Sequence, residues 1–407
     1  MSQAYLATRW RILLLLFLVR TTMAVQFQMV ATLSPAIEET FAVSLADVGV
    51  LIGLYFAPGI FIAAPGGALG RTFGEKRCVL AGLALMILGG ALMVVSEAWS
   101  AQLTGRFVSG IGGVVLNVLL TKMVADWFAG REISFAMAVF VNSWPVGIAI
   151  ALVGLPFVAV AGGLAFAMGL VTAIVAAGFA GLLLFYRAPA DELRLASSPT
   201  GKVRGVVLWA LLSAGAIWGL YNAALAIVFS FGPQLFVSRG MTLTDAGSLT
   251  SLILWCLAIV GTVAGYLADR SGRRLQFIAL GNLGFGFCVY LASLTGNSVL
   301  IVLAMGIFSG VAVGAMVSLP SLVLAPEARA FGMGIFFTVY YVCIAAGPMI
   351  AGGLSEWAGL AAAFQLAAIL LFVTVVLLPL FHWLSKRTYA QSLAEYQPVL
   401  KMHERQR

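Results

Sequence analysis

Charged residues are scarce in this chain. Only 9% of the 407 residues are Asp, Glu, Lys or Arg, whereas 62% are hydrophobic and the mean hydropathy is +1.06. A soluble domain needs about a quarter of its residues charged to cover its surface, so the composition excludes a soluble globular protein. The sequence therefore predicts a protein that crosses the membrane several times.

Residues that usually carry catalysis or bind metals are equally scarce. The two histidines, His382 and His403, lie near the C-terminal end. Apart from Asp47 and His382 at helix ends, no Asp, Glu or His falls inside an expected membrane helix, so we expect no catalytic residue, no metal site and no cofactor, and a membrane enzyme is disfavoured. The four cysteines have no Cys-x-x-Cys spacing and are predicted to be packing residues. They are Cys78, Cys256, Cys288 and Cys343.

Long apolar stretches are plentiful. A helix needs about 20 apolar residues to cross roughly 30 Å of hydrocarbon, and twelve stretches meet this condition. The ten-residue segments of alternating polarity that mark a membrane barrel occur nowhere, so the expected fold class is an all-α membrane protein. The expected helices span residues 12–33, 47–69, 78–96, 101–124, 133–157, 163–185, 207–230, 246–268, 276–294, 298–324, 331–353 and 361–383.

The distribution of basic residues predicts the topology. Cytoplasmic loops retain Lys and Arg, and placing both termini in the cytoplasm puts all but three of the 23 Lys and Arg on that side or at its helix ends. The exceptions are Arg239, in an outer loop, and Arg20 and Arg106, within helices. The outer loops are acidic instead, with Glu38, Glu39, Asp47, Glu97, Asp245 and Glu356.

This topology predicts an integral multi-pass protein of the cytoplasmic membrane with both termini inside. The net charge of +8 then reflects topology. Nucleic acid is not an expected partner, because its binding surface would gather basic residues on a soluble domain. The expected partners are the lipid bilayer and small molecules, and the chain is expected to be a monomer.

Polar composition divides the chain into halves. Residues 187–205 turn polar, with Pro, Ser, Asp and Glu, and are predicted to be a cytoplasmic linker. The expected organisation is an N-terminal six-helix bundle at 1–186, this linker, a C-terminal six-helix bundle at 206–384 and a charged, partly disordered tail at 385–407. The first apolar stretch is too long for the core of a signal peptide, so we expect it to be retained.

An internal repeat relates the two halves at an offset of 198 residues. Residues 265–274 read Gly-Tyr-Leu-Ala-Asp-Arg-Ser-Gly-Arg-Arg, and an altered copy at 67–76 reads Gly-Ala-Leu-Gly-Arg-Thr-Phe-Gly-Glu-Lys. The same offset pairs Pro35 with Pro233, Leu45 with Leu243, Asp47 with Asp245, Gly49 with Gly247, Leu54 with Leu252 and Arg131 with Arg329. Such repeats are expected in transporters whose halves rock around a central site.

These two loops, together with residues 106–113 (Arg-Phe-Val-Ser-Gly-Ile-Gly-Gly) on the fourth helix, resemble the signatures of the major facilitator superfamily. The resemblance covers all twelve helices and implies two pseudo-symmetric six-helix bundles that alternate access to a central site. Within that superfamily, residues 121–132 and the Asn142–Gly147 segment most resemble the cyanate and nitroimidazole transporter-like branch.

One position departs from the family pattern. The family usually has Asp where this chain has Arg71, whereas the second half keeps Asp269. The resemblance implies that these loops brace helix ends during the conformational cycle, with Asp126 a candidate partner for Arg71. The alternative is that their basic residues are simple cytoplasmic anchors. The residues assigned to the cycle are Gly67, Arg71, Gly74, Arg106, Asp126, Arg131, Gly265, Asp269, Arg270, Gly272, Arg273 and Arg329.

Two arginines are expected inside the membrane. Arg20 falls near the middle of the first helix, and Arg106 lies nearer the outer end of the fourth. Each would cost about 3 kcal/mol if it faced lipid, so both should face a cavity or a partner. Embedded cations without an embedded carboxylate favour an anionic ligand, because the arginine fork suits carboxylate-like groups. A structural role is the alternative for both, and Arg106 shares its motif with carriers of many substrates.

Neutral polar and aromatic residues complete the expected binding site. The resemblance implies that the cavity is lined mainly by the first, fourth, seventh and tenth helices, and the missing N–H of Pro145 frees a carbonyl beside it. Single Trp or Tyr residues are more often packing or interface residues, so the two buried amides Asn117 and Asn222 are the stronger candidates. The substrate-binding candidates are Arg20, Gln28, Asn117, Asn142, Trp144, Trp218, Tyr221 and Asn222.

The function predicted from these features is secondary active transport of a small anionic solute by alternating access. Importing an anion against an inside-negative potential costs about 2.3 kcal/mol per 100 mV, so a co-transported or exchanged ion is an expected partner. Drug or cation efflux is the alternative, although it would favour an embedded carboxylate. A receptor with this fold would usually carry a soluble output domain, which the linker and tail are too short to form.

Overall fold

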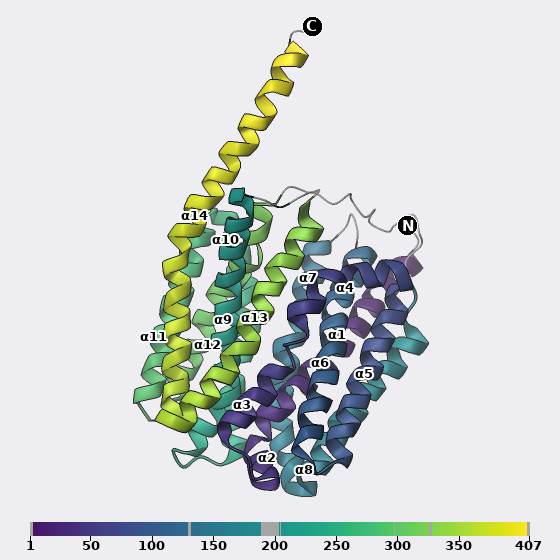
Figure 1. Ribbon diagram of the computed structural model, residues 1–407, viewed down its shortest axis with the longest axis vertical. Coiled ribbons are helices and arrows are strands. Elements are labelled where there is room, and N and C mark those ends of the chain that lie inside the picture. The colour runs from purple at the N-terminus through teal and green to yellow at the C-terminus, as the bar shows by residue number, and fades with distance from the viewer. Residues whose placement is uncertain are drawn as a thin grey trace.

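The computed structural model consists of helices joined by short connections (Figure 1). It describes residues 3–128, 132–188, 203, 205–296, 298–324 and 328–404. Within these ranges the side chains at 3–7, 64–68, 71, 134, 317, 329–330 and 389–404 are not described. Eleven of the described helices are long and apolar enough to cross a membrane.

The first half of the chain forms a bundle in which α1 packs on α8, and α5 packs on α6 and α8. Its helices are α1 (Gln3–Thr32), α2 (Ser34–Phe41), α3 (Leu45–Leu54), α4 (Gly59–Phe73), α5 (Glu75–Val95), α6 (Trp99–Trp127), α7 (Ile133–Val141) and α8 (Ser143–Phe185).

In the second half, α9 packs on α13 and α14, and α12 packs on α10 and α11. Its helices are α9 (Gly205–Val237), α10 (Leu243–Ser271), α11 (Arg274–Leu294), α12 (Val299–Val317), the short 3-10 helix η2 (Leu319–Leu322), α13 (Arg329–Ala358) and α14 (Leu360–Glu404). The fold is therefore the predicted all-α membrane bundle.

Three predicted helices differ in detail from the observed ones. The second crossing is broken, because α3 ends at Leu54 and α4 begins at Gly59, with Pro58 between them. The fifth and sixth crossings form one 51-residue apolar stretch, Phe135–Phe185. At about 1.5 Å per residue this stretch is far too long for one crossing, and the non-helical backbone of Gly163 divides it into two.

Repeated local geometry supports the duplication. Gly74 and Gly272, which are equivalent at the repeat offset, both adopt a positive φ of 86° and 66° where one helix ends. At the start of α3 the Ser44 hydroxyl accepts a hydrogen bond from the Asp47 N–H, and at the start of α10 the Thr242 hydroxyl does the same for Asp245. The two halves thus use the same turn and the same helix cap.

The chain termini lie at one end of the bundle, called here the terminal face (Figure 1). The predicted linker at 187–205 lies mostly outside the described residues. The predicted tail from residue 385 is not a separate element, because α14 continues through it to Glu404 and projects beyond the bundle. The side chains of its last turns are not described.

The halves meet closely toward the opposite face. There α3 packs on α13, while α4, which runs from Gly59 toward the terminal face, packs on α13 further along, and α8 packs on α10. A Cβ on Gly49 would lie 2.6 Å from the carbonyl oxygen of Pro348, and one on Gly53 would overlap the carbonyl oxygen of Ala345. Glycine therefore permits backbone-to-backbone contact between the halves.

Candidate functional site

Arg20 is the central residue of the 25-residue apolar span Thr8–Thr32. Its Nε and Nη2 donate to the Asn117 Oδ1 at 3.2 and 3.0 Å, so the guanidinium of α1 and the amide of α6 form a two-pronged contact. Its Nη1 donates to the carbonyls of Phe140 and Val141 at 3.3 and 3.2 Å, and to the Ser143 hydroxyl at 3.4 Å. All these partners are neutral.

The carbonyl of Val141 is available because of Pro145. In a regular helix the N–H four residues later would donate to it, and proline has none. The helix is interrupted here, with α7 ending at Val141 and α8 beginning at Ser143. The sequence predicted a freed carbonyl beside the site, and Arg20 is the group that binds it.

The surroundings of Arg106 differ from those of Arg20. Arg106 is fully buried, and it donates to the carbonyls of Leu51, Gln26 and Phe27 at 3.0, 2.9 and 2.7 Å. Its guanidinium also lies 4.5 Å from the ring centroid of Tyr55, a cation–π contact. Arg106 therefore ties α6 to α1 and α3, whereas Arg20 is only partly buried.

The break in the second crossing supplies one of the acceptors of Arg106. The N–H of Tyr55 donates to Ile52 instead of continuing the regular pattern to Leu51. The carbonyl of Leu51 is then free for the Nε of Arg106. Both embedded arginines thus bind carbonyls released where a proline-containing segment interrupts a helix.

Two tyrosines of α13 complete the surroundings of Arg20. The Asn117 Nδ2 donates to the Tyr341 hydroxyl at 3.3 Å across the boundary between the halves. Tyr340 and Tyr341 both lie near Arg20. Their rings touch each other edge to face at 4.9 Å. Tyr341 is buried and Tyr340 is partly exposed.

The remaining candidates divide into two groups. Trp218 is half-buried and stacks on Tyr340 and Tyr221 at 6.3 and 6.1 Å, while Tyr221 is fully buried and donates to the Ser309 carbonyl. Trp218 therefore belongs to the same surface as Tyr340. The amide of Asn222 donates back to Trp218 within α9 at 2.8 Å.

Three further candidates lie at or near the contact between the two halves. They are Gln28, Asn142 and Trp144. The Gln28 Nε2 donates to the Phe229 carbonyl at 3.3 Å, and Gln28 is fully buried. The Asn142 Nδ2 lies 3.5 Å from the Thr262 hydroxyl of the other half. Trp144 stacks on Phe27 at 5.3 Å. Gln28 therefore contributes to the closed contact and does not line the region around Arg20.

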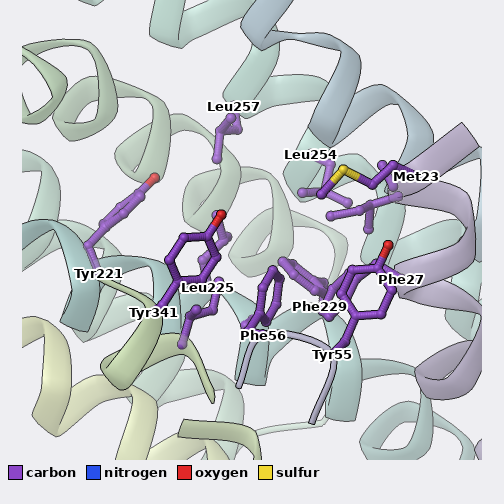
Figure 2. Close-up of a cluster of buried hydrophobic side chains, with 14 of the residues drawn as sticks. Met23, Phe27, Tyr55, Phe56, Tyr221, Leu225, Phe229, Leu254, Leu257 and Tyr341 are labelled. Atoms are coloured by element: carbon purple, nitrogen blue, oxygen red, sulfur yellow. The ribbon is translucent and has the colours of Figure 1, made fainter. Parts of the chain in front are cut away.

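Aromatic side chains from both halves fill the space beyond Arg20. Phe27 meets Phe229 at 6.0 Å, and Phe56 meets Tyr341 at 6.2 Å. In Figure 2, Phe56 and Phe229 lie between Tyr341 on one side and Phe27 and Tyr55 on the other. We call these five residues the aromatic plug. It separates the partly exposed region of Arg20 from the face opposite the termini.

A polar contact closes that opposite face. Gln234 at the end of α9 donates to the Ser34 hydroxyl at 2.5 Å and to the Glu38 carboxylate at 2.9 Å, which joins α9 to α2. Burial raises the pKa of Glu38, and the hydrogen bond from Gln234 partly offsets that rise. Glu38 and Gln234 line an open pocket of about 460 Å³ between the halves.

This contact predicts that acid favours the closed face. The raised pKa means that Glu38 binds its proton more tightly when the face is closed than when the carboxylate is in water. Protonation of Glu38 at low pH therefore stabilises the closed face, and this stabilisation is lost as the pH rises through the raised pKa. Glu38→Gln should remove the pH dependence. The difference in thermal stability between wild type and Glu38→Gln, followed from pH 4 to 8, measures it. The exposed neighbour variant Glu39→Gln is the control, and an equal loss of pH dependence in Glu39→Gln would contradict the prediction.

At the terminal face, the loop residues form separate ion pairs in the two halves. Lys122 contacts Glu75 and lies 2.8 Å from Asp126, whose side chain is 1% exposed. Lys122 lies one helical turn away on α6 and provides a positive charge for Asp126, while the side chain of Arg71, the candidate partner from the sequence, lies outside the described residues. In the second half, Arg274 pairs with the exposed Asp269 at 2.8 Å.

Lys122→Met should destabilise the protein by about 2–3 kcal/mol, somewhat less than the roughly 3–5 kcal/mol for breaking a fully buried pair, because Lys122 is 36% exposed and water screens the charge that remains. The cause is the buried Asp126 carboxylate, which would lose its cation. Thermal unfolding in detergent measures the change. Lys122→Met combined with Asp126→Asn should recover most of it.

The exposed pair gives the matched control for Lys122. Arg274→Met removes the partner of Asp269, which is 62% exposed, and exposed pairs contribute about 0–1 kcal/mol. Equal destabilisation by Lys122→Met and Arg274→Met would contradict the assignment of Asp126 as a buried paired carboxylate.

Other loop residues are described only in part. Arg270 lies 3.3 Å from the Tyr266 hydroxyl, Arg273 lines a pocket with Arg274, and Gly265 packs against Gly314. Arg131 lies outside the described residues, as do the side chains at Gly67, Arg71 and Arg329.

The sequence did not identify Tyr340, Tyr341 and Ser143 as site residues. The tyrosines lie on α13, which was not expected to line the site, although adjacent tyrosines near the middle of an apolar span were a visible signal. Ser143 contributes through its position beside the helix interruption.

Comparisons with known proteins agree with this architecture. The sequence model of the Major Facilitator Superfamily matches residues 16–238 and 207–397. Uncharacterized MFS-type transporters of two Mycobacterium tuberculosis strains, CDC 1551 and H37Rv, are each 24% identical over 385 residues, covering 91% of this chain and 85% of theirs. A crystal structure of a bacterial homolog to the human lysosomal transporter Spinster, inward-facing and occupied, has a TM-score of 0.69 at 19% identity, covering 96% of this chain and 99% of that one.

Proposed function

Since the chain belongs to the Major Facilitator Superfamily, a family of membrane transporters, we propose that it transports a small anionic solute. Its two halves would alternate access to the region around Arg20. The proposal depends on one observation above all: Arg20, a partly buried residue, lies midway through its membrane span, and all hydrogen-bond partners of its guanidinium in the described part of the chain are neutral.

The hydrogen-bonding capacity of Arg20 supports a ligand. A guanidinium carries five N–H groups in a fixed fork. Nε and Nη2 share the Asn117 oxygen, and Nη1 faces two carbonyls and Ser143. This leaves one N–H of Nη2 without a partner among the described residues. An anionic group at this position would neutralise the charge and accept that hydrogen bond.

Alternating access is supported by the distribution of contacts between the halves. The close contacts at Gly49, Gly53 and Gln234 lie beyond the aromatic plug, toward the face opposite the termini. The region of Arg20 would then be reached from the terminal face in this conformation. Opening the opposite face would require α3 to separate from α13, and α2 from α9.

Topology and coupling are part of the same proposal. We infer a cytoplasmic-membrane protein with cytoplasmic termini, because basic residues gather at the terminal face. An anion entering against the potential opposes about 2.3 kcal/mol per 100 mV, so export, exchange or entry with a cation would accompany transport. We also retain the cyanate and nitroimidazole transporter-like branch as a proposal, supported by residues 121–132 and 142–147, and a monomeric carrier.

Efflux of a lipophilic cation is the second candidate. The half-buried rings of Trp218 and Tyr340 favour it, because aromatic faces attract cations. The positive charge of Arg20 opposes it. No carboxylate at this level in the described chain offsets that charge.

Flux into liposomes containing the purified protein tests the proposal. We expect transport of small monocarboxylates and none of lipophilic amines, both measured with the membrane potential clamped at zero. Transport of amines without carboxylates would support the second candidate and reject the first. Transport of neither class, by protein that is folded in the liposomes, would reject both.

A further inference from the structure

The substrate class of this site can be narrowed by the rings that accompany Arg20. We propose that the site takes a monoanion with a flat, apolar body, such as an aromatic monocarboxylate, with the carboxylate at Arg20 and the ring against Trp218 and Tyr340. This inference rests on the proposed function and adds the shape of the solute to its charge.

The aromatic surface is partly exposed and continuous. Trp218 and Tyr340 stack at 6.3 Å with their planes 28° apart, and Tyr340 meets Phe337 at 6.1 Å and Tyr341 at 4.9 Å. Trp218, Phe337 and Tyr340 are each partly exposed, whereas Tyr341 is buried. Large aromatic rings with exposed faces in the interior of a membrane bundle are suited to binding an apolar surface.

The aromatic surface lies next to the positive charge of Arg20. Tyr341 is joined to Arg20 through Asn117, and the ring centroid of Tyr340 lies 4.9 Å from that of Tyr341. The Phe140 ring centroid also lies 4.9 Å from the guanidinium carbon of Arg20. A ligand whose carboxylate binds Arg20 would therefore have its body beside the rings of α9 and α13.

The charge of the site indicates a single negative charge on the ligand. Among the described side chains, Arg20 is the one cation that is partly exposed near the middle of the span, since Arg106 is fully buried and bound to three carbonyls. A dianion would leave one charge without a cationic partner, which is costly away from water. A compact monoanion would satisfy Arg20 but leave the aromatic surface uncovered.

Four named compounds separate these properties. Benzoate has the charge and the flat ring, formate has only the charge, cyclohexanecarboxylate has the charge and a bulky body that is not flat, and benzylammonium has the ring with the opposite charge. Burying an aromatic ring should make benzoate bind roughly 10- to 100-fold more tightly than formate. Benzoate should also exceed cyclohexanecarboxylate by roughly two- to tenfold.

Substitutions then locate the ring. Trp218→Leu and Tyr340→Leu should each weaken benzoate binding by about three- to tenfold and leave formate binding within about twofold of wild type. Trp209→Leu is the matched control, because Trp209 lies on the same helix and is 63% exposed on its outer surface. It should change neither affinity. Isothermal titration of the purified protein in detergent measures all of these affinities.

The outcomes separate this inference from the proposed function. Benzoate preferred over formate and cyclohexanecarboxylate, with a selective loss in Trp218→Leu, supports the inference. Equal affinity for benzoate and formate in wild type overturns it while leaving anion binding intact, and this comparison does not depend on how any variant folds. Benzylammonium binding in place of all three carboxylates overturns both the inference and the proposed function.

Discussion

Arg20→Gln is expected to weaken binding of a monocarboxylate by about 10- to 100-fold, the effect of losing a charge-assisted hydrogen bond to the anion. Gln keeps a hydrogen-bonding side chain but removes the positive charge. The protein should still fold, because the partners of Arg20 are neutral and no buried carboxylate is left unpaired. Ligand-induced thermal stabilisation, measured with the monocarboxylate that stabilises wild type most, reports the change.

Two further variants make the Arg20 experiment specific. Arg20→Lys should recover only part of the affinity, because an ammonium group is a point charge and cannot replace the planar fork held by Asn117. Arg270→Gln removes one positive charge from the exposed loop at the terminal face and should leave affinity unchanged. Equal weakening by Arg20→Gln and Arg270→Gln would mean that overall charge, and not a local contact, attracts the anion.

Gly53→Ala is expected to slow transport by about tenfold or more while leaving substrate binding nearly intact. The added Cβ would overlap the carbonyl oxygen of Ala345 on α13. Since a backbone atom cannot move aside as a side chain can, closing the face opposite the termini would become less favourable. Overpacking of this kind costs about 1–3 kcal/mol, or roughly 5- to 150-fold in the balance between conformations.

Gly353→Ala is the matched control for Gly53→Ala. Gly353 lies on α13, and a Cβ there would meet nothing within 4 Å. Flux in liposomes and ligand-induced stabilisation should therefore match wild type in Gly353→Ala, whereas Gly53→Ala should lose flux alone. Normal flux in Gly53→Ala would show that close contact between α3 and α13 is not needed for the transport cycle.

Sequence patterns predicted the features of this protein that depend on local chemistry. Apolar length predicted the membrane helices, and the repeat offset predicted equivalent turns at Gly74 and Gly272. The missing N–H of Pro145 predicted a free carbonyl at the site, which Arg20 binds. These features follow from a few neighbouring residues, because the length of a helix and a carbonyl left without its N–H partner are both determined by the local sequence.

Features that depend on packing between distant segments were harder to predict from the sequence. Tyr341 meets Asn117 across the two halves, and no spacing within either segment indicates that contact. The pairing of Lys122 with Asp126 was not predicted, although helical geometry places Lys122 one turn away on the same face of α6. Gln28 shares a face with Arg20, yet the fold buries it against Phe229.

The central claim is that Arg20 binds the transported anion, and counterflow of one labelled monocarboxylate tests it most directly. Liposomes are loaded with excess unlabelled compound, and uptake of external label is followed at zero membrane potential. Wild-type protein should accumulate label transiently, and Arg20→Gln, reconstituted at the same density, should accumulate at least about tenfold less. Equal counterflow in the two proteins would contradict the claim and leave Arg20 as a structural charge.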